Sequence, residues 1–203
     1  MLNTNTAEII QFWFGDLVDG LPDEAHQALW YRGDKSDDIF IQQHFGALLT
    51  AAAAGQLVEW ESTPAGRFAL ILLLDQFSRN CARGTAQAFA YDAQAMALLQ
   101  EGLVQGADKA LLPIERQFFY MPLQHSEVLA LQNQGVALFQ ALRDETQNTA
   151  GAALFQQCFE FAQQHQAIIA QFGRFPHRNA VLERASTEEE IVYLQGGGAR
   201  FGQ

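Results

Sequence analysis

Cysteine and long apolar runs are scarce in this chain of 203 residues. The two cysteines, Cys81 and Cys158, lack the paired spacing of a metal site and stand among apolar residues, so we expect buried free thiols. No segment reaches the ~18 uninterrupted apolar residues of a membrane helix. The N-terminal MLNTNTAEII has neither the basic nor the apolar part of a secretory signal. These absences predict a cytoplasmic protein that does not bind membranes.

Lysine is scarce as well, because ten of the twelve basic residues are arginine and only Lys35 and Lys109 are lysine. With 23 acidic residues the net charge is −11, which disfavours binding to nucleic acids and to anionic membranes. Solubility does not require arginine, whereas partly buried positions and bidentate carboxylate pairing favour it. The arginines are therefore the strongest candidates for a site.

The common catalytic and nucleotide-binding motifs are missing. The sequence contains no G-x-S-x-G elbow, no P-loop and no Rossmann glycine pattern, and neither cysteine has the flanking residues of a nucleophile. There is no H-x-x-x-H or H-E-x-x-H pair, so the sequence predicts no metal and no cofactor. Any site must be assembled from distant segments.

Helical periodicity dominates the chain, and no segment shows the alternating pattern of a strand. The sequence therefore predicts an all-α fold of about eight or nine helices, in a single domain over residues 1–195. Residues 20–33 are expected to be rich in turns. The glycine-rich tail at 196–203 is expected to be loose unless Phe201 docks it.

Several helix ends carry recognisable signals. Asn5 or Thr6 can cap the first helix, and Thr63 stands directly before a proline, as at many helix starts. The helix that follows Thr63 is apolar nearly all round, which is typical of a central, buried helix. Asp92 is expected to cap a later helix, and Gly173 to end the longest apolar stripe.

The first polar stretch that needs an explanation is LLLDQFSRNCARG, residues 72–84. Asp75, Arg79 and Arg83 recur at every fourth position and share one helix face. Asp75 follows four aliphatic residues, so we expect it to be at least half buried and paired with Arg79. The pair, with Asn80 beside it, is then either a structural network or one side of a site in which Arg83 receives an anion.

The second stretch is FFYMPLQHSE, residues 118–127. His125 and Glu127 are two positions apart and face different sides of a regular helix, which makes them a poor catalytic pair. If Pro122 starts the helix, Glu127 lies in its first turn and can act as a cap. His125 remains open as acid, base or ligand.

His165 lies on the long apolar stripe that runs from Leu154 to Phe172. A histidine there is typically a core residue with one hydrogen-bond partner. The alternative is a metal ligand together with His125 and His177, which requires that distant segments meet.

The third stretch is FGRFPHRN, residues 172–179. Its proline can start a helix whose N-terminal amides, with Arg174, His177 and Arg178, bind a carboxylate or phosphate. Alternatively, the arginines and Asn179 satisfy the last carbonyl groups of the preceding helix, and the two phenylalanines fix the corner.

The segments LLLDQFSRNCARGTAQAFAYD, RQFFYMPLQHSE and HQAIIAQFGRFPHRNAVLERASTEEEIVYL, in this order, resemble the bacterial family catalogued as domain of unknown function 924. The resemblance spans nearly the whole chain and implies a helical-repeat fold similar to tetratricopeptide proteins. Ser78 stands where the family usually has proline, and Glu183 where it usually has glycine. The family has no established activity, so the resemblance implies no substrate.

Three functions fit these observations. The first is a binding module with a groove for an acidic peptide or a small anion, lined by arginine and histidine. The second is a small hydrolase with a histidine acid–base and an arginine clamp. In the third the polar cluster is purely structural. The groove residues are predicted to be Arg79, Arg83, His125, Arg174, His177 and Arg178, and the supporting polar network Asp75, Asn80, Glu127, His165 and Asn179.

Overall fold

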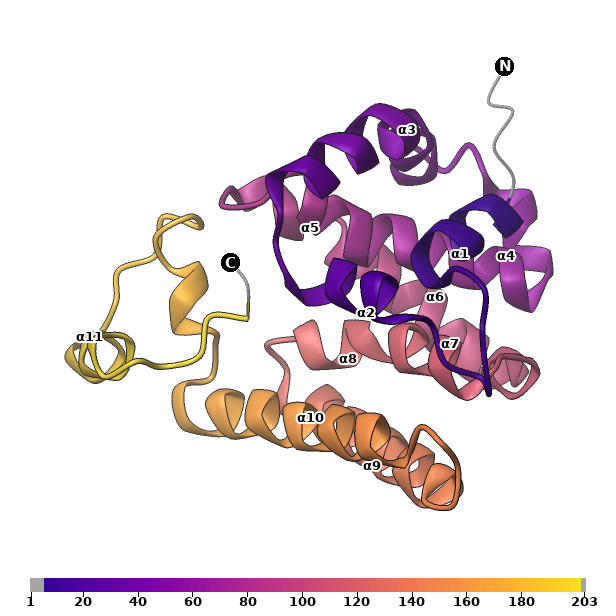
Figure 1. Cartoon of the computed structure of the whole chain (residues 1–203). Coiled ribbons are helices and arrows are strands. Elements are labelled where there is room, and N and C mark those ends of the chain that lie inside the picture. Colours follow the sequence, from indigo (N-terminus) through magenta and orange to yellow (C-terminus); the bar gives the residue numbers. More distant parts are fainter. Residues whose placement is uncertain (1–5, 202–203) are drawn as a thin grey trace.

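The computed structural model describes residues 6–201, and within that range helices are joined by short loops without a β-strand (Figure 1). The all-α prediction is confirmed. The helices are α1 (Thr6–Phe14), α2 (Glu24–Tyr31), α3 (Lys35–Ala53), α4 (Pro64–Ile71), α5 (Ser78–Cys81), α6 (Asp92–Gln105), α7 (Pro113–Phe119), α8 (Met121–His125), α9 (Leu129–Thr146), α10 (Ala152–Phe172) and α11 (Glu188–Gln195). Short 3-10 turns are η1 (Val58–Ser62), η3 (Ala86–Phe89), η4 (Ala107–Ala110) and η5 (Pro176–Arg178).

The helix ends follow the sequence signals in most places. The Thr63 side chain accepts a hydrogen bond from the Gly66 amide at the start of α4, and Gly173 ends α10 in the left-handed conformation with φ 70°. Thr6 is the first residue of α1, whereas a cap at Asn5 lies outside the described residues. Asp92 was expected as a cap but is the first residue inside α6, so its carboxylate is available for other partners.

The stretch at 20–33 contains a helix that the turn prediction missed. The Asp23 side chain accepts a hydrogen bond from the His26 amide and caps α2. The ring of Trp30, near the end of α2, packs edge-on against Phe118 with centroids 4.7 Å apart. Tertiary packing of this aromatic residue therefore stabilises a helix too short to form by propensity alone.

The centre of the molecule is a continuous helical rod of α4, the π-helical segment η2 (Leu72–Phe77) and α5. Every residue from 66 to 80 in this rod is buried, which confirms the prediction of a central helix. Helices α3 and α6 pack against the rod, and α9 and α10 form an antiparallel pair along one side (Figure 1). If the rod counts once and α7 and α8, which meet at Tyr120, count once, the described chain has nine helical units. Their tetratricopeptide-like superhelical arrangement stays a prediction.

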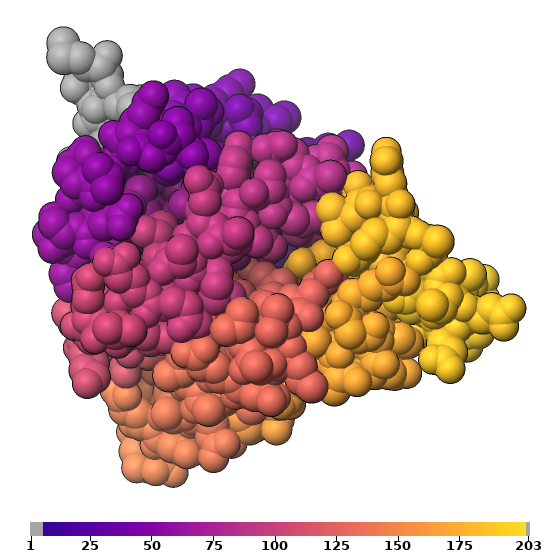
Figure 2. Space-filling model, turned by 180° about the vertical axis from the view of Figure 1, so that it is seen from behind, coloured from indigo at the N-terminus to yellow at the C-terminus, as the bar shows by residue number. Residues whose placement is uncertain are grey.

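A second, smaller core joins the C-terminal segment to α10. Ile168, Ile169 and Phe175 form its centre, and Tyr193 and Phe201 pack around them. In the space-filling view the C-terminal segment lies against segments from the middle of the chain (Figure 2). Phe201 is thus docked. None of the helices between residues 6 and 201 has the length and apolar character required to cross a bilayer.

Candidate functional site

The candidate site is built around Asp75, which lies in the π-helical segment of the central rod and has no exposed surface. A π-helical turn widens the hydrogen-bond ladder and is common at functional positions. The hydroxyl of Ser78 donates to the carbonyl of Leu74 over 2.6 Å and helps to satisfy the widened turn. The local backbone thus presents a buried carboxylate from the most enclosed helix of the fold.

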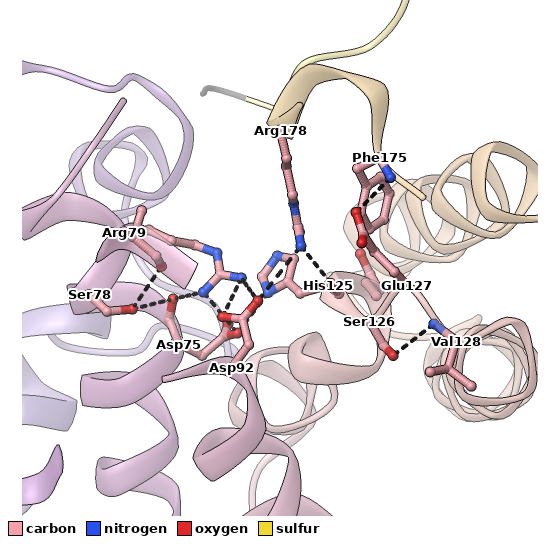
Figure 3. Close-up of polar contacts among 12 residues, drawn as sticks. Asp75, Ser78, Arg79, Asp92, His125, Ser126, Glu127, Val128, Phe175 and Arg178 are labelled. Atoms are coloured by element: carbon pink, nitrogen blue, oxygen red, sulfur yellow. Dashed lines mark hydrogen bonds and ion pairs between the residues drawn. The ribbon is translucent and has the colours of Figure 1, made fainter. Parts of the chain in front are cut away.

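Three side chains surround the Asp75 carboxylate, and Figure 3 shows two of them, Arg79 and His125. The Arg79 guanidinium lies 3.2 Å from Oδ1, and Nδ1 of His125 lies 2.8 Å from the same oxygen. The amide of Gln76 donates to Oδ2 over 2.6 Å. A buried carboxylate requires such partners, because unpaired burial costs several kcal/mol, ~3–5 when a partner is deleted.

The protonation states follow from these contacts. Burial favours the neutral acid, but Arg79 and His125 together hold the pKa of Asp75 well below its usual range. Burial, with the nearby charge of Arg79, lowers the pKa of the His125 imidazole. Asp75 is therefore ionised and can only accept hydrogen bonds. The neutral His125 ring accordingly carries its proton on Nδ1, and this N–H donates a hydrogen bond to Asp75.

A second carboxylate, from Asp92, completes the cluster. Asp92 Oδ1 lies 2.9 Å from Nη2 of Arg79, and its Oδ2 lies 3.7 Å from Nη1 of Arg178. Burial raises the pKa of Asp92, although Arg79 opposes the shift. We call Asp75, Arg79, Asp92 and His125 the inner cluster.

Arg83 and Asn80 extend the inner cluster toward α3. Both bind Asp38: Nε of Arg83 lies 2.8 Å from one carboxylate oxygen, and the Asn80 amide donates to the other over 2.8 Å. The sequence pattern predicted Arg83 and Asn80 as site or network residues but gave no role to Asp38. A helix periodicity shows which residues share one face, and it contains no information on which acid a distant helix brings to them.

The inner cluster borders a cavity of about 240 Å³. Arg79, Asn80, Arg83, His125 and His165 line it, so five of the sequence-predicted residues meet there. Aromatic rings form much of the remaining wall, namely Trp30, Tyr31, Phe139, Phe161 and Phe201. Among the described residues, no Asp or Glu lines the cavity directly. The cavity therefore combines two imidazoles, two guanidinium groups and further aromatic rings.

Arg178 supports the site from outside the cavity. Its guanidinium lies over the rings of Phe89 and Phe175, at 4.5 and 4.4 Å from their centroids, and Nη1 donates to the backbone carbonyl of His125 over 3.0 Å. Burial lowers the pKa of Arg178 to about 10, with Arg79 as a further cause, so the side chain stays charged at neutral pH. This contact holds the end of α8, from which His125 projects.

Three further predicted residues, Glu127, Arg174 and Asn179, belong to a separate network. Arg184 pairs with Glu127 at 2.6 Å, and Glu127 also accepts the backbone amide of Phe175 over 2.8 Å. Arg174 pairs with Glu190 at 2.6 Å, and the amide of Asn179 donates to the same carboxylate at 3.1 Å. We call Glu127, Arg174, Arg184 and Glu190, with Asn179, the corner cluster.

The corner cluster corrects two expectations from the sequence. Glu127 lies in the loop between α8 and α9, beyond the end of α8, so it caps no first turn and instead ties that loop to Arg184. Pro176 starts only the three-residue turn η5, which is too short to form a helix N-terminal anion site. Arg174, which was expected to bind the same anion, pairs with Glu190 instead and does not line the cavity.

His165 and His177 lie near each other but do not form a metal site with His125. The Nδ1–H of His165 donates to the carbonyl of Phe161 over 2.7 Å, as expected for a core histidine with one partner. His177 packs against the ring of Phe175, with centroids 5.5 Å apart. Within residues 6–201, no three His, Cys, Asp or Glu side chains are grouped to hold a metal ion.

Comparisons with known proteins agree with this architecture. Residues 9–198 match the family described as bacterial protein of unknown function, DUF924. The chain belongs to this family. It is also similar to a solved protein of unknown function from Agrobacterium tumefaciens, with 35% identity over 95% of this chain and 97% of that one and a TM-score of 0.80. No curated protein is similar enough to count as a match.

One local conformation fits an expectation from the sequence. Glu183, where the resemblance implies glycine, adopts a left-handed backbone with φ 54°. Glycine takes this conformation without the steric cost that other residues incur. The resemblance and the backbone conformation therefore both indicate that position 183 suits glycine.

Proposed function

We propose that the protein is a hydrolase in which His125 acts as the general base at the cavity. The observation that carries the proposal is the 2.8 Å contact between Nδ1 of His125 and the wholly buried carboxylate of Asp75. A carboxylate that holds one imidazole nitrogen fixes the tautomer and leaves the lone pair on Nε2. Because His125 lines the cavity, that nitrogen is the group best suited to take a proton from a bound water.

The lowered pKa of His125 suits a base more than an acid. The imidazole is unprotonated at neutral pH, because burial and Arg79 disfavour its charged form. Water activated by Nε2 would attack a carbonyl carbon, and the negative charge that develops on the carbonyl oxygen needs nearby donors. Arg79 and Arg83 also line the cavity and supply positive charge for this purpose.

Water is a better nucleophile for this site than a cysteine. Cys158 lines the cavity, but burial raises the pKa of its thiol to about 12, so the thiol stays protonated and unreactive. Water would add to the carbonyl carbon while His125 takes its proton; the tetrahedral intermediate would then collapse with cleavage of the bond to the leaving oxygen or nitrogen, to which His125 returns the proton. His125 is the base in these steps, and the arginines are the oxyanion partner.

A second candidate is a binding module that holds a carboxylate without chemistry. It is favoured by the arrangement of charge, since Arg79 and Arg83 line the cavity while Asp75 and Asp38 contact them from outside the lining. A ligand carboxylate would pair with the guanidinium groups.

Hydrolysis of 4-nitrophenyl acetate by wild type and His125→Gln tests the first proposal. Removal of a general base lowers kcat/KM by about 10²- to 10⁴-fold, so we expect a loss of that order. His44→Gln is the matched control, because His44 is exposed on α3 and any nonspecific imidazole reaction would report there. Equal rates in all three proteins would exclude the hydrolase. Benzoate binding that is lost in Arg83→Gln would then support the second candidate.

A further inference from the structure

The segment after α11 runs back toward the centre of the molecule (Figure 1). Its Phe201 lines the cavity. The Phe201 ring stacks on His165, with centroids 3.7 Å apart and planes inclined by 20°. Phe175 and His177 meet the same ring edge-on, at centroid distances of 6.2 and 5.7 Å. Three rings, one from α10, one from the residue before η5 and one from η5, thus surround one aromatic ring.

This ring site adjoins the proposed base. The rings of His165 and His125 are in edge-to-face contact, with centroids 6.3 Å apart. His125, His165 and Phe201 all line the same cavity. A ring in the place of Phe201 would therefore share the cavity with the imidazole that is positioned by Asp75, with His165 in contact with both.

The walls of the ring site are uncharged. Burial lowers the pKa of His165 to about 3, and burial with the neighbouring Arg178 lowers that of His177 to about 3. The hydrogen bond from Nδ1 of His165 to Phe161 fixes the orientation of the stacked ring. Neutral, fixed rings pack well on a neutral aromatic ring and offer no counter-ion to a charged one.

Phe201 itself is held by local contacts. Its φ is 50°, a left-handed conformation that is strained for a bulky side chain. Within the described chain, the hydrogen bonds of residues 199–201 run back to α11: the Ala199 amide donates to the Tyr193 hydroxyl, and Arg200 to the Leu194 carbonyl. Phe201 can therefore leave His165 without the loss of a hydrogen bond to the cavity.

We propose that His165, Phe175 and His177 form a binding subsite for an uncharged aromatic ring of the ligand, and that Phe201 fills this subsite until the ligand displaces it. The inference deepens the proposed function and its catalytic meaning rests on that function. It assigns the substrate class as a neutral ester or amide that carries an aromatic ring next to the scissile carbonyl.

The test compares benzyl alcohol with cyclohexylmethanol, two uncharged probes of similar size of which only the first has an aromatic ring. Calorimetric titration of the full chain is expected to show that Phe201→Ala binds benzyl alcohol about fivefold more tightly than wild type, the ratio expected for one aromatic pair. Cyclohexylmethanol should gain less, because it can fill the vacated space but cannot stack on His165. No gain for benzyl alcohol, or the same gain for both probes, would overturn the subsite.

Phe201→Leu protects the test against misfolding of the alanine variant. Leucine keeps an apolar side chain in the small C-terminal core but lacks the stacking ring. The affinity of Phe201→Leu for benzyl alcohol should therefore lie between those of wild type and Phe201→Ala. A gain absent from Phe201→Leu and Phe201→Ala alike contradicts the proposal. Addition of benzyl alcohol should also shift the imidazole NMR signals of His165, and unchanged signals would place the probe elsewhere.

The same titration in a His125→Gln background separates this inference from the proposed function. The gain caused by Phe201→Ala should persist there, because ring binding does not require a base. If the gain persists but no His125-dependent hydrolysis is found, the hydrolase fails and the subsite stands. If hydrolysis depends on His125 but the gain is absent, only the subsite fails.

Discussion

The inner cluster and the corner cluster use the same residue types for different ends. In the inner cluster, Asp75 has no exposed surface and its partners border a cavity. In the corner cluster, the Glu127 and Arg184 side chains keep 28% and 24% of their surface exposed and join a loop to the C-terminal segment. Arginine–carboxylate pairing alone thus says little about function. Access to a cavity separates a candidate site from a structural tie, whereas burial alone does not, since Glu190 and Asn179 of the corner cluster are buried as well.

Alanine replacement should separate the two clusters most strongly. Asp75→Ala leaves Arg79 buried without its carboxylate and is expected to lower the free energy of unfolding by about 3–5 kcal/mol. Glu127→Ala removes a partly exposed pair and one backbone contact, so about 1–2 kcal/mol is expected. Urea unfolding measures both values. Losses of equal size would show that the clusters do not differ in burial energetics.

Acid should weaken the cavity wall at His165 before it weakens the corner cluster. The pKa of His165 is about 3 in the folded protein because of burial, so below the usual value of 6.5 the unfolded chain binds more protons and stability falls. At pH 5 this effect amounts to about 2 kcal/mol for a fully buried histidine. Hydrogen bonds from Arg184 outweigh burial and hold the pKa of Glu127 below its usual 4.5, so the contribution of this carboxylate is lost only at lower pH.

Urea titrations at pH 7, 6 and 5 measure this difference. His165→Gln should reduce the slope of stability against pH, whereas His44→Gln, on the exposed face of α3, should leave it unchanged. An unaltered slope in His165→Gln would mean that His165 is not the acid-sensitive group.

The smallest expected effect concerns the backbone beside the corner cluster. Glu183→Gly should raise stability by about 1 kcal/mol, because glycine accepts the left-handed φ of 54° without strain. Gly173→Ala is the mirror control: its φ is 70° and no other atom lies near the added methyl group, so a loss of similar size is expected from the backbone alone. Thermal melts of both variants check the pair. A loss of stability in Glu183→Gly would imply that the Glu183 side chain contributes contacts of its own.

The fold was readable from the sequence because helix formation depends on local patterns. The apolar run after Thr63 predicted the buried rod, and Gly173 predicted the end of α10. Helix α2 was not predicted, because its stability comes from the packing of Trp30 on distant Phe118 rather than from an apolar periodicity in the sequence.

The site could be predicted only in part, because local patterns in the sequence do not show which distant segments meet. Asp75 and Arg79 share one helix, so their pairing followed from spacing. His125 and Asp75 are fifty positions apart, and nothing local in the sequence pairs them. Asp92 was expected as a helix cap, and its contact with Arg79 emerges only when α6 packs on the rod. Arg184 carried no distinguishing signal, because an arginine in a loop is ordinary.

The geometry of the inner cluster depends on the number of residues in the π-helical segment at Leu72–Phe77. At its end the amide of Ser78 bonds five residues back, to Leu73, instead of four. Loss of a single residue here would restore regular α-helical winding and rotate all that follows by about 100° relative to what precedes. Asp75 and Asn80 would then no longer face His125 and Asp38 at the same time. Length in this segment is therefore as much a determinant of the site as residue identity.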